Sequence, residues 1–121
     1  MSAVELKKIS KRYGNFNAVN SVDLVVNSAE FLTLLGPSGC GKTTTLRLIA
    51  GFAKPTIGSV VIGGVDVTNI PPHLREVGLV FQDYALFPHM NVGENVEFGL
   101  KMRKTPKAER TERVGKALEL V

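Results

Sequence analysis

Gly36-Pro37-Ser38-Gly39-Cys40-Gly41-Lys42-Thr43, here called the phosphate loop, matches the pattern G-x-x-x-x-G-K-[ST] at every fixed position. Glycines let backbone N–H groups turn inward around an anion, because a residue without a Cβ reaches positive φ. Lys42 can then reach the β and γ phosphates, and the Thr43 hydroxyl is placed to hold Mg²⁺. The pattern therefore predicts a nucleotide-phosphate site, and a glycine-rich turn with an incidental lysine is the alternative.

The segments around the phosphate loop predict an α/β fold. Residues 31–35 form a continuous apolar run, which is typical of a parallel strand buried on both faces. The next segment, 44–50, predicts a helix with Leu46, Ile49 and Ala50 on one stripe and Gly51 as its stop. A second apolar run, 77–81, predicts another buried parallel strand.

Antiparallel strands and two further helices are predicted from the remaining segments. Residues 4–12 and 21–26 alternate as strands, with a turn at 13–15, and residues 58–67 indicate a hairpin that breaks at 63–64. Prolines in 70–73 exclude a strand there. Asn91 and Glu94 form a near capping box, and Thr105-Pro106 opens a last helix as cap and first-turn proline. Its apolar stripe continues to the last residue, so we expect the chain to end within an element.

Composition indicates one small domain with a formal net charge of +4 in 121 residues. Seven of the basic residues fall within 101–121, either as a solvated helical surface or as a site for an anionic partner. The single cysteine excludes an intramolecular disulfide and fits a reducing compartment. The start is no signal peptide, and no apolar run approaches the roughly 18 residues of a membrane span, so we expect a cytoplasmic chain.

Three features outside the phosphate loop are candidates for binding. Tyr13 precedes a Gly-Asn turn, where an aromatic side chain serves either turn packing or a ligand. Gln82 follows the second apolar run, at the end of a strand where ligand groups are presented. The loop 84–90 is apolar and is either core or a docking surface for another protein. His89 has no second metal-ligating residue at suitable spacing, which argues against a metal site there.

Three features occur together in this sequence: the phosphate loop, Tyr13-Gly14, and residues 80–89 (Val-Phe-Gln-Asp-Tyr-Ala-Leu-Phe-Pro-His). With all three, the sequence resembles the N-terminal half of an ATP-binding-cassette (ABC) transporter ATPase over nearly all 121 residues. The resemblance is greatest to polyamine importer subunits, with iron, sulfate and sugar importers close. It implies a P-loop NTPase core with an antiparallel β subdomain and a helical subdomain from about residue 91, with ATP and Mg²⁺ as cofactors.

The resemblance also implies residue roles. Tyr13 would stack on the adenine ring. The phosphates would be held by Gly36, Pro37, Ser38, Gly39, Cys40, Gly41, Lys42, Thr43 and Thr44. Thr43 would bind Mg²⁺, and Gln82 would contact the metal and the attacking water, so Lys42 and Gln82 are the catalytic candidates. Leu86, Phe87 and His89 would border the groove that receives the membrane-spanning permease subunit. A second ATPase subunit would complete the site, and no nucleic acid is expected.

The chain departs from this family in two minor ways and one major way. Ala29 stands where Gly is usual, and Ile57 where Ser is common. The Leu-Ser-Gly-Gly-Gln signature, the catalytic strand with its carboxylates and the switch histidine would lie beyond Val121, so we expect a truncated domain at the inner face of the cell membrane that binds ATP and hydrolyses it negligibly. A non-catalytic fragment and a soluble ABC-type ATPase acting on DNA or ribosomes are the alternatives.

Overall fold

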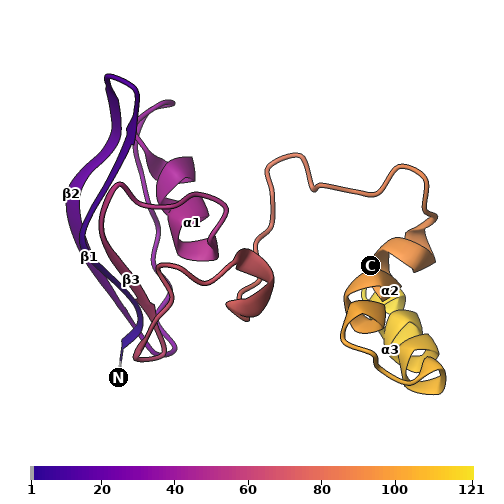
Figure 1. Ribbon diagram of the computed structural model, residues 1–121. Coiled ribbons are helices and arrows are strands. Elements are labelled where there is room, and N and C mark those ends of the chain that lie inside the picture. Colours follow the sequence, from indigo (N-terminus) through magenta and orange to yellow (C-terminus); the bar gives the residue numbers. More distant parts are fainter. Residues whose placement is uncertain (1) are drawn as a thin grey trace. The chain divides into compact units, whose positions relative to one another are not determined.

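The computed structural model describes residues 2–121, in two compact units that are taken here in turn. The first ends at Leu79 and the second runs Val80–Val121. The first contains four strands and the helix that follows the phosphate loop, and the second contains a pair of helices (Figure 1).

The first unit is built on an antiparallel sheet with the strand order β2-β1-β3-β4. The strands are β1 (Ser2–Tyr13), β2 (Phe16–Asn27), β3 (Ile57–Ile62) and β4 (Val65–Asp66). Leu6 on β1 pairs with Leu24 on one side and with Val60 on the other. The predicted strands over 4–12 and 21–26 and the predicted hairpin over 58–67 are confirmed.

Helix α1 (Lys42–Ala50) packs its buried face against this sheet. The core residues come from β1, β2, α1, β3 and the segment after β4, namely Leu6, Ile9, Val19, Leu48, Val60 and Val67. The predicted helix and its stop at Gly51 (φ 90°) are confirmed. The predicted stripe is wrong at Leu46, which is 46% exposed, because Leu48 enters the core instead.

The two predicted parallel strands do not form. Residues 31–35 have no strand pairing, and Phe31 and Leu35 are 92% and 90% exposed. Residues 77–81 are likewise outside any strand, with Val80 86% exposed. A parallel strand receives its backbone hydrogen bonds only from neighbouring strands. Within residues 2–121 all strand pairings are antiparallel, and these apolar segments take part in none of them.

Arg75 is a buried charged residue that sequence inspection missed. It follows a short 3₁₀ turn, η1 (Pro72–Leu74), and is only 6% exposed. Its guanidinium donates to the carbonyls of Leu48 and Ile49 in the last turn of α1 at 2.9 and 3.0 Å. It also donates to the carbonyls of Ile70 and Thr68 at 2.7 and 3.3 Å. Arg75 thereby satisfies helix-end carbonyls that α1 cannot pair itself, and burial lowers the pKa of the guanidinium.

The second unit contains α2 (Val92–Met102) and α3 (Lys107–Glu119). The near capping box is a complete one, since the Asn91 side chain accepts from the Glu94 N–H and Glu94 accepts from the Asn91 N–H. Pro106, not Thr105, is the N-cap of α3, which has no side-chain cap. The helices are linked by an ion pair between Arg110 and Glu97 at 2.7 Å.

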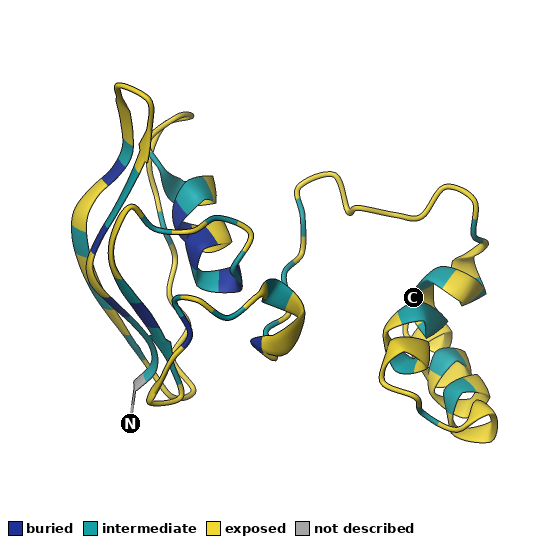
Figure 2. Cartoon of the chain, viewed as in Figure 1, coloured by how far each residue is buried: buried dark blue, intermediate teal, exposed yellow. Residues whose placement is uncertain are grey.

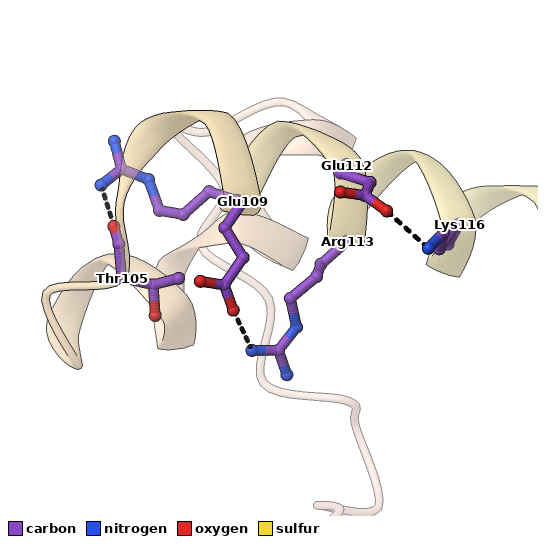
Figure 3. Close-up of polar contacts among 6 residues, drawn as sticks. Thr105, Glu109, Glu112, Arg113 and Lys116 are labelled. Carbon is purple, nitrogen blue, oxygen red and sulfur yellow. Dashed lines mark hydrogen bonds and ion pairs between the residues drawn. The ribbon is translucent and has the colours of Figure 1, made fainter.

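Six of the seven basic residues in 101–121 are exposed, and three of the seven, Arg110, Arg113 and Lys116, are ion-paired. Arg113 pairs with Glu109 and Lys116 with Glu112, each one turn apart (Figure 3). These exposed pairs are worth only about 0.5 kcal/mol each. None of the residues 80–121 is buried, as Figure 2 shows for α2 and α3. The apolar stripe predicted for α3 is therefore only partly buried: Val114 is of intermediate burial and Leu118 is 37% exposed.

Replacing Arg75 by Met should loosen the C-terminal end of α1. The buried carbonyls of Leu48 and Ile49 would lose their donor, at a cost of about 2 to 4 kcal/mol. Amide hydrogen exchange of α1 measures this loss as reduced protection. Arg12→Met, at an exposed arginine of the same unit, is the matched control. Unchanged protection in Arg75→Met would contradict the role given to these hydrogen bonds.

Candidate functional site

The phosphate loop runs directly into the first turn of α1. Gly39 and Gly41 have φ values of 81° and 97°, and Gly41 is the N-cap of the helix. A Cβ on Gly41 would lie 2.5 Å from the Ala18 carbonyl oxygen on β2, so glycine is required by space as well as by conformation. The loop is therefore packed against the sheet of its own unit.

The N-terminus of α1 has free backbone donors. No side chain caps it, and the first hydrogen bond inside the helix runs from the Thr45 N–H to the Gly41 carbonyl at 2.9 Å. The N–H groups before Thr45 therefore point out of the helix without an intrahelical partner. They carry the positive end of the helix dipole, which favours a bound anion.

The Lys42 side chain folds back over the phosphate loop. Its ammonium donates to the carbonyls of Gly36 and Pro37, the second at 2.9 Å, and contacts the Cys40 Sγ at 3.6 Å. Within residues 2–121 no carboxylate forms a salt bridge with it. The positive charge thus lies at the loop with only neutral acceptors, which an anionic phosphate can replace.

Two threonine hydroxyls in the first turn of α1 differ in their hydrogen bonding. Thr45 is 8% exposed, and its Oγ1 donates to the Gly41 carbonyl at 2.8 Å, which ties the helix to its own cap. Thr43 is exposed, and among the described residues its hydroxyl makes no hydrogen bond. A free hydroxyl beside the helix N-terminus is a suitable oxygen ligand for Mg²⁺, so the residues present fit Mg²⁺ and a phosphate chain.

Tyr13 ends β1 in the same unit as the phosphate loop. Its ring is 50% exposed, and it pairs with Phe16 across the turn at Gly14, where φ is 57°. Ala18, which contacts Gly41, lies two residues beyond Phe16 on β2. One hairpin therefore carries both the exposed aromatic ring and the backbone against which the phosphate loop packs.

Gln82 belongs to the second unit, whereas Tyr13 and Lys42 belong to the first. It is exposed and begins a turn over residues 82–85, closed by a hydrogen bond from the Tyr84 N–H to the Phe81 carbonyl at 3.0 Å. Tyr84 and Ala85 both have positive φ, at 64° and 50°. Left-handed backbone is uncommon for residues with a Cβ, and two in succession mark a strained turn.

The predicted docking residues Leu86, Phe87 and His89 are all exposed. The exposed fraction is 69% for Leu86 and 36% for Phe87. The Phe87 ring lies 4.5 Å from the Phe98 ring of α2 and 6.0 Å from the His89 ring, centroid to centroid. Beside them is a groove of about 390 Å³, lined by His89, Met90, Glu94, Glu97, Phe98, Lys101 and Met102. The loop rests on α2 with its apolar side chains accessible.

Asn95 holds this loop against α2, and the sequence analysis missed it. Its Oδ1 accepts from the Phe87 N–H at 2.9 Å. Its Nδ2 donates to the carbonyls of Phe87, Met90 and Asn91 at 3.3, 3.2 and 2.9 Å. Asparagine is a poor residue for a helix interior, so its presence within an otherwise regular helix was the available signal.

Most of the chain matches a known protein family. The profile described as "ABC transporter" matches residues 19–121. The chain belongs to the ABC transporter family. It is 57% identical to a protein of Acidothermus cellulolyticus named "Spermidine/putrescine import ATP-binding protein PotA", over 98% of this chain and 32% of that protein. A Photorhabdus laumondii protein named "Fe(3+) ions import ATP-binding protein FbpC" is 54% identical, over 98% of this chain and 34% of its own length.

The chain therefore spans about a third of the length of the curated relatives it matches. Their names confirm the predicted resemblance to polyamine and iron importer subunits. Within residues 2–121, no helix has the length and apolar character that crossing a membrane requires.

Solved structures confirm the predicted fold class. The bacterial ABC transporter cassette MJ0796, solved as a dimer, superposes with a TM-score of 0.85 at 31% identity, over 96% of this chain and 56% of that chain. A dimeric post-hydrolysis state of MJ0796 bound to ADP and Pi gives 0.83 at 31% identity, with the same coverage. The antiparallel sheet and helices of this chain thus have the fold of the matched part of an ABC transporter cassette.

Replacing Asn95 by Ala should release the loop 86–90 from α2. The Phe87 N–H would lose its acceptor, and at about 1 kcal/mol for a hydrogen bond its exchange protection should fall about fivefold or more. Amide hydrogen exchange at Phe87 and Met90 measures the effect. The control is Asn20→Ala, at an exposed asparagine of β2. Equal protection of Phe87 in both variants would show that Asn95 does not hold the loop.

Proposed function

We propose that this chain is the ATP-binding portion of an ABC importer ATPase, and that the phosphate loop holds the phosphates of Mg·ATP. The observation that carries the proposal is the uncapped N-terminus of α1 with the Lys42 ammonium lying on the same loop. Backbone donors, a helix dipole and a lysine converge there, and each favours a bound anion. Membership of the ABC transporter family supports the same ligand.

Each residue has a defined task in this proposal. The loop glycines and the first N–H groups of α1 hydrogen-bond the phosphates, and Lys42 exchanges its loop carbonyls for the β and γ phosphate oxygens. Bound Mg²⁺, held by Thr43, neutralises part of the phosphate charge. Tyr13 stacks on adenine. Gln82, in the second unit, has the role of orienting the attacking water.

Hydrolysis needs more than this chain provides. Phosphoryl transfer to water depends on positioning and on stabilisation of developing charge. The 121 residues contain no Leu-Ser-Gly-Gly-Gln signature, and the resemblance assigns none of their carboxylates to the water or to the metal. We therefore propose that the chain binds Mg·ATP and hydrolyses it negligibly.

The proposed setting is solute uptake at the inner face of the cell membrane. The names of the relatives support a polyamine as the transported solute, with iron next. Leu86, Phe87 and His89 are the proposed contact for a membrane-spanning permease subunit, since they are accessible beside the α2 groove. A second ATPase subunit is the other proposed partner, supported by the dimeric MJ0796 structures. Three of the seven basic residues in 101–121 are neutralised by ion pairs, which reduces the positive charge that a nucleic acid could use.

Lys42→Ala tests nucleotide binding and turnover together. Loss of a charged hydrogen-bond donor to phosphate is worth roughly 1.5 to 3 kcal/mol, so affinity for Mg·ATP should fall about ten- to a hundredfold by titration calorimetry. Phosphate release by the unaltered chain should remain at background.

The matched control is Lys8→Ala, at an exposed lysine of β1. Equal affinity of the unaltered chain and Lys42→Ala would overturn the binding site. Turnover above background that disappears in Lys42→Ala would show that the chain hydrolyses ATP by itself.

A further inference from the structure

Lys11 contacts the ring of Tyr13. The two residues are two positions apart near the end of β1. The Lys11 ammonium lies 5.0 Å from the centroid of the Tyr13 ring. This distance is within the range of a cation–π interaction.

The ammonium is itself held in place. It donates to the Lys54 carbonyl at 2.7 Å, in the segment that follows α1. That segment is hydrogen-bonded along β1 by two further contacts, from the Arg12 N–H to the Thr56 hydroxyl at 3.0 Å and from the Thr56 N–H to the Ser10 carbonyl at 2.8 Å. Lys11 therefore joins an anchored segment of backbone to the aromatic ring.

A ring held in this way has one face in contact with a cation and is still half exposed. A side chain that is already ordered loses less conformational entropy when a ligand binds, so the remaining surface of the ring is prepared for stacking. The quadrupole of the ring attracts the Lys11 ammonium, which therefore occupies one face of the ring. An adenine base can then stack only on the other face.

We propose that Lys11 is a positioning residue of the base site: it fixes the Tyr13 ring so that adenine stacks on the face opposite the ammonium. This inference rests on the proposed ATP-binding function and adds to it a residue with no assigned role. It also predicts that Lys11 acts on the base and not on the phosphates.

The test compares two ligands, Mg·ATP and magnesium tripolyphosphate, which has the phosphates without the base. Lys11→Met keeps the aliphatic stem and removes the charge. For the 121-residue chain, it should weaken Mg·ATP binding about two- to fivefold, the size of an exposed cation–π contact, and leave tripolyphosphate binding unchanged. Lys11→Arg should retain ATP affinity, because guanidinium also packs on aromatic faces. Lys8→Met is the matched control, at an exposed lysine of the same strand.

A double-variant cycle checks that Lys11 acts through the ring. In a Tyr13→Ala background, Lys11→Met should have no further effect on Mg·ATP affinity. If Lys11→Met weakens the binding of Mg·ATP and of tripolyphosphate equally, the proposal is overturned. Such a result would mean that Lys11 acts through a long-range charge effect on the phosphates or through a folding defect. Unchanged ATP affinity would overturn it also.

The cycle also separates this inference from the proposed function. If Tyr13→Ala leaves ATP affinity unchanged, both the stacking role of Tyr13 and the role of Lys11 are wrong. The phosphate site is still tested independently, because tripolyphosphate affinity should fall in Lys42→Ala whatever Tyr13 and Lys11 do.

Discussion

The packing of Gly41 against the Ala18 carbonyl is the constraint on which the candidate site depends. It sets the start of α1 on β2, at a distance that only a residue without a Cβ allows. At the other end of the helix, Arg75 pairs the carbonyls of Leu48 and Ile49. With both ends held and Leu48 in the core, α1 presents its free N–H groups in a constant direction.

The site is thus organised by backbone more than by side chains. The N–H donors belong to the main chain, and Lys42 is oriented by the loop carbonyls that it contacts. The half-exposed ring of Tyr13 is in contact with the Lys11 ammonium. Preorganised donors cost little reorganisation when an anion binds, which is why a short loop of small residues can bind phosphate.

Much of this was predictable because it depends on local spacing. The phosphate loop, the turn at Gly14, the α1 stop at Gly51 and the Asn91–Glu94 capping box each involve residues within one or two turns of each other, and all were predicted. Arg75 and Asn95 were missed, because their partners are backbone groups whose positions no residue type reveals. The apolar runs 31–35 and 77–81 were misassigned, because a parallel strand depends on neighbouring strands, and all strand pairs within residues 2–121 are antiparallel and exclude these runs.

By itself, the sequence determined the phosphate loop, the family resemblance and the order of most elements, since the chemistry of glycine, lysine and capping residues acts over a few positions. Only the tertiary structure decided that Leu48 and not Leu46 enters the core, that Arg75 closes α1, and that Lys11 covers Tyr13. Those outcomes depend on which segments lie beside each other, and packing of residues far apart in the chain determines that.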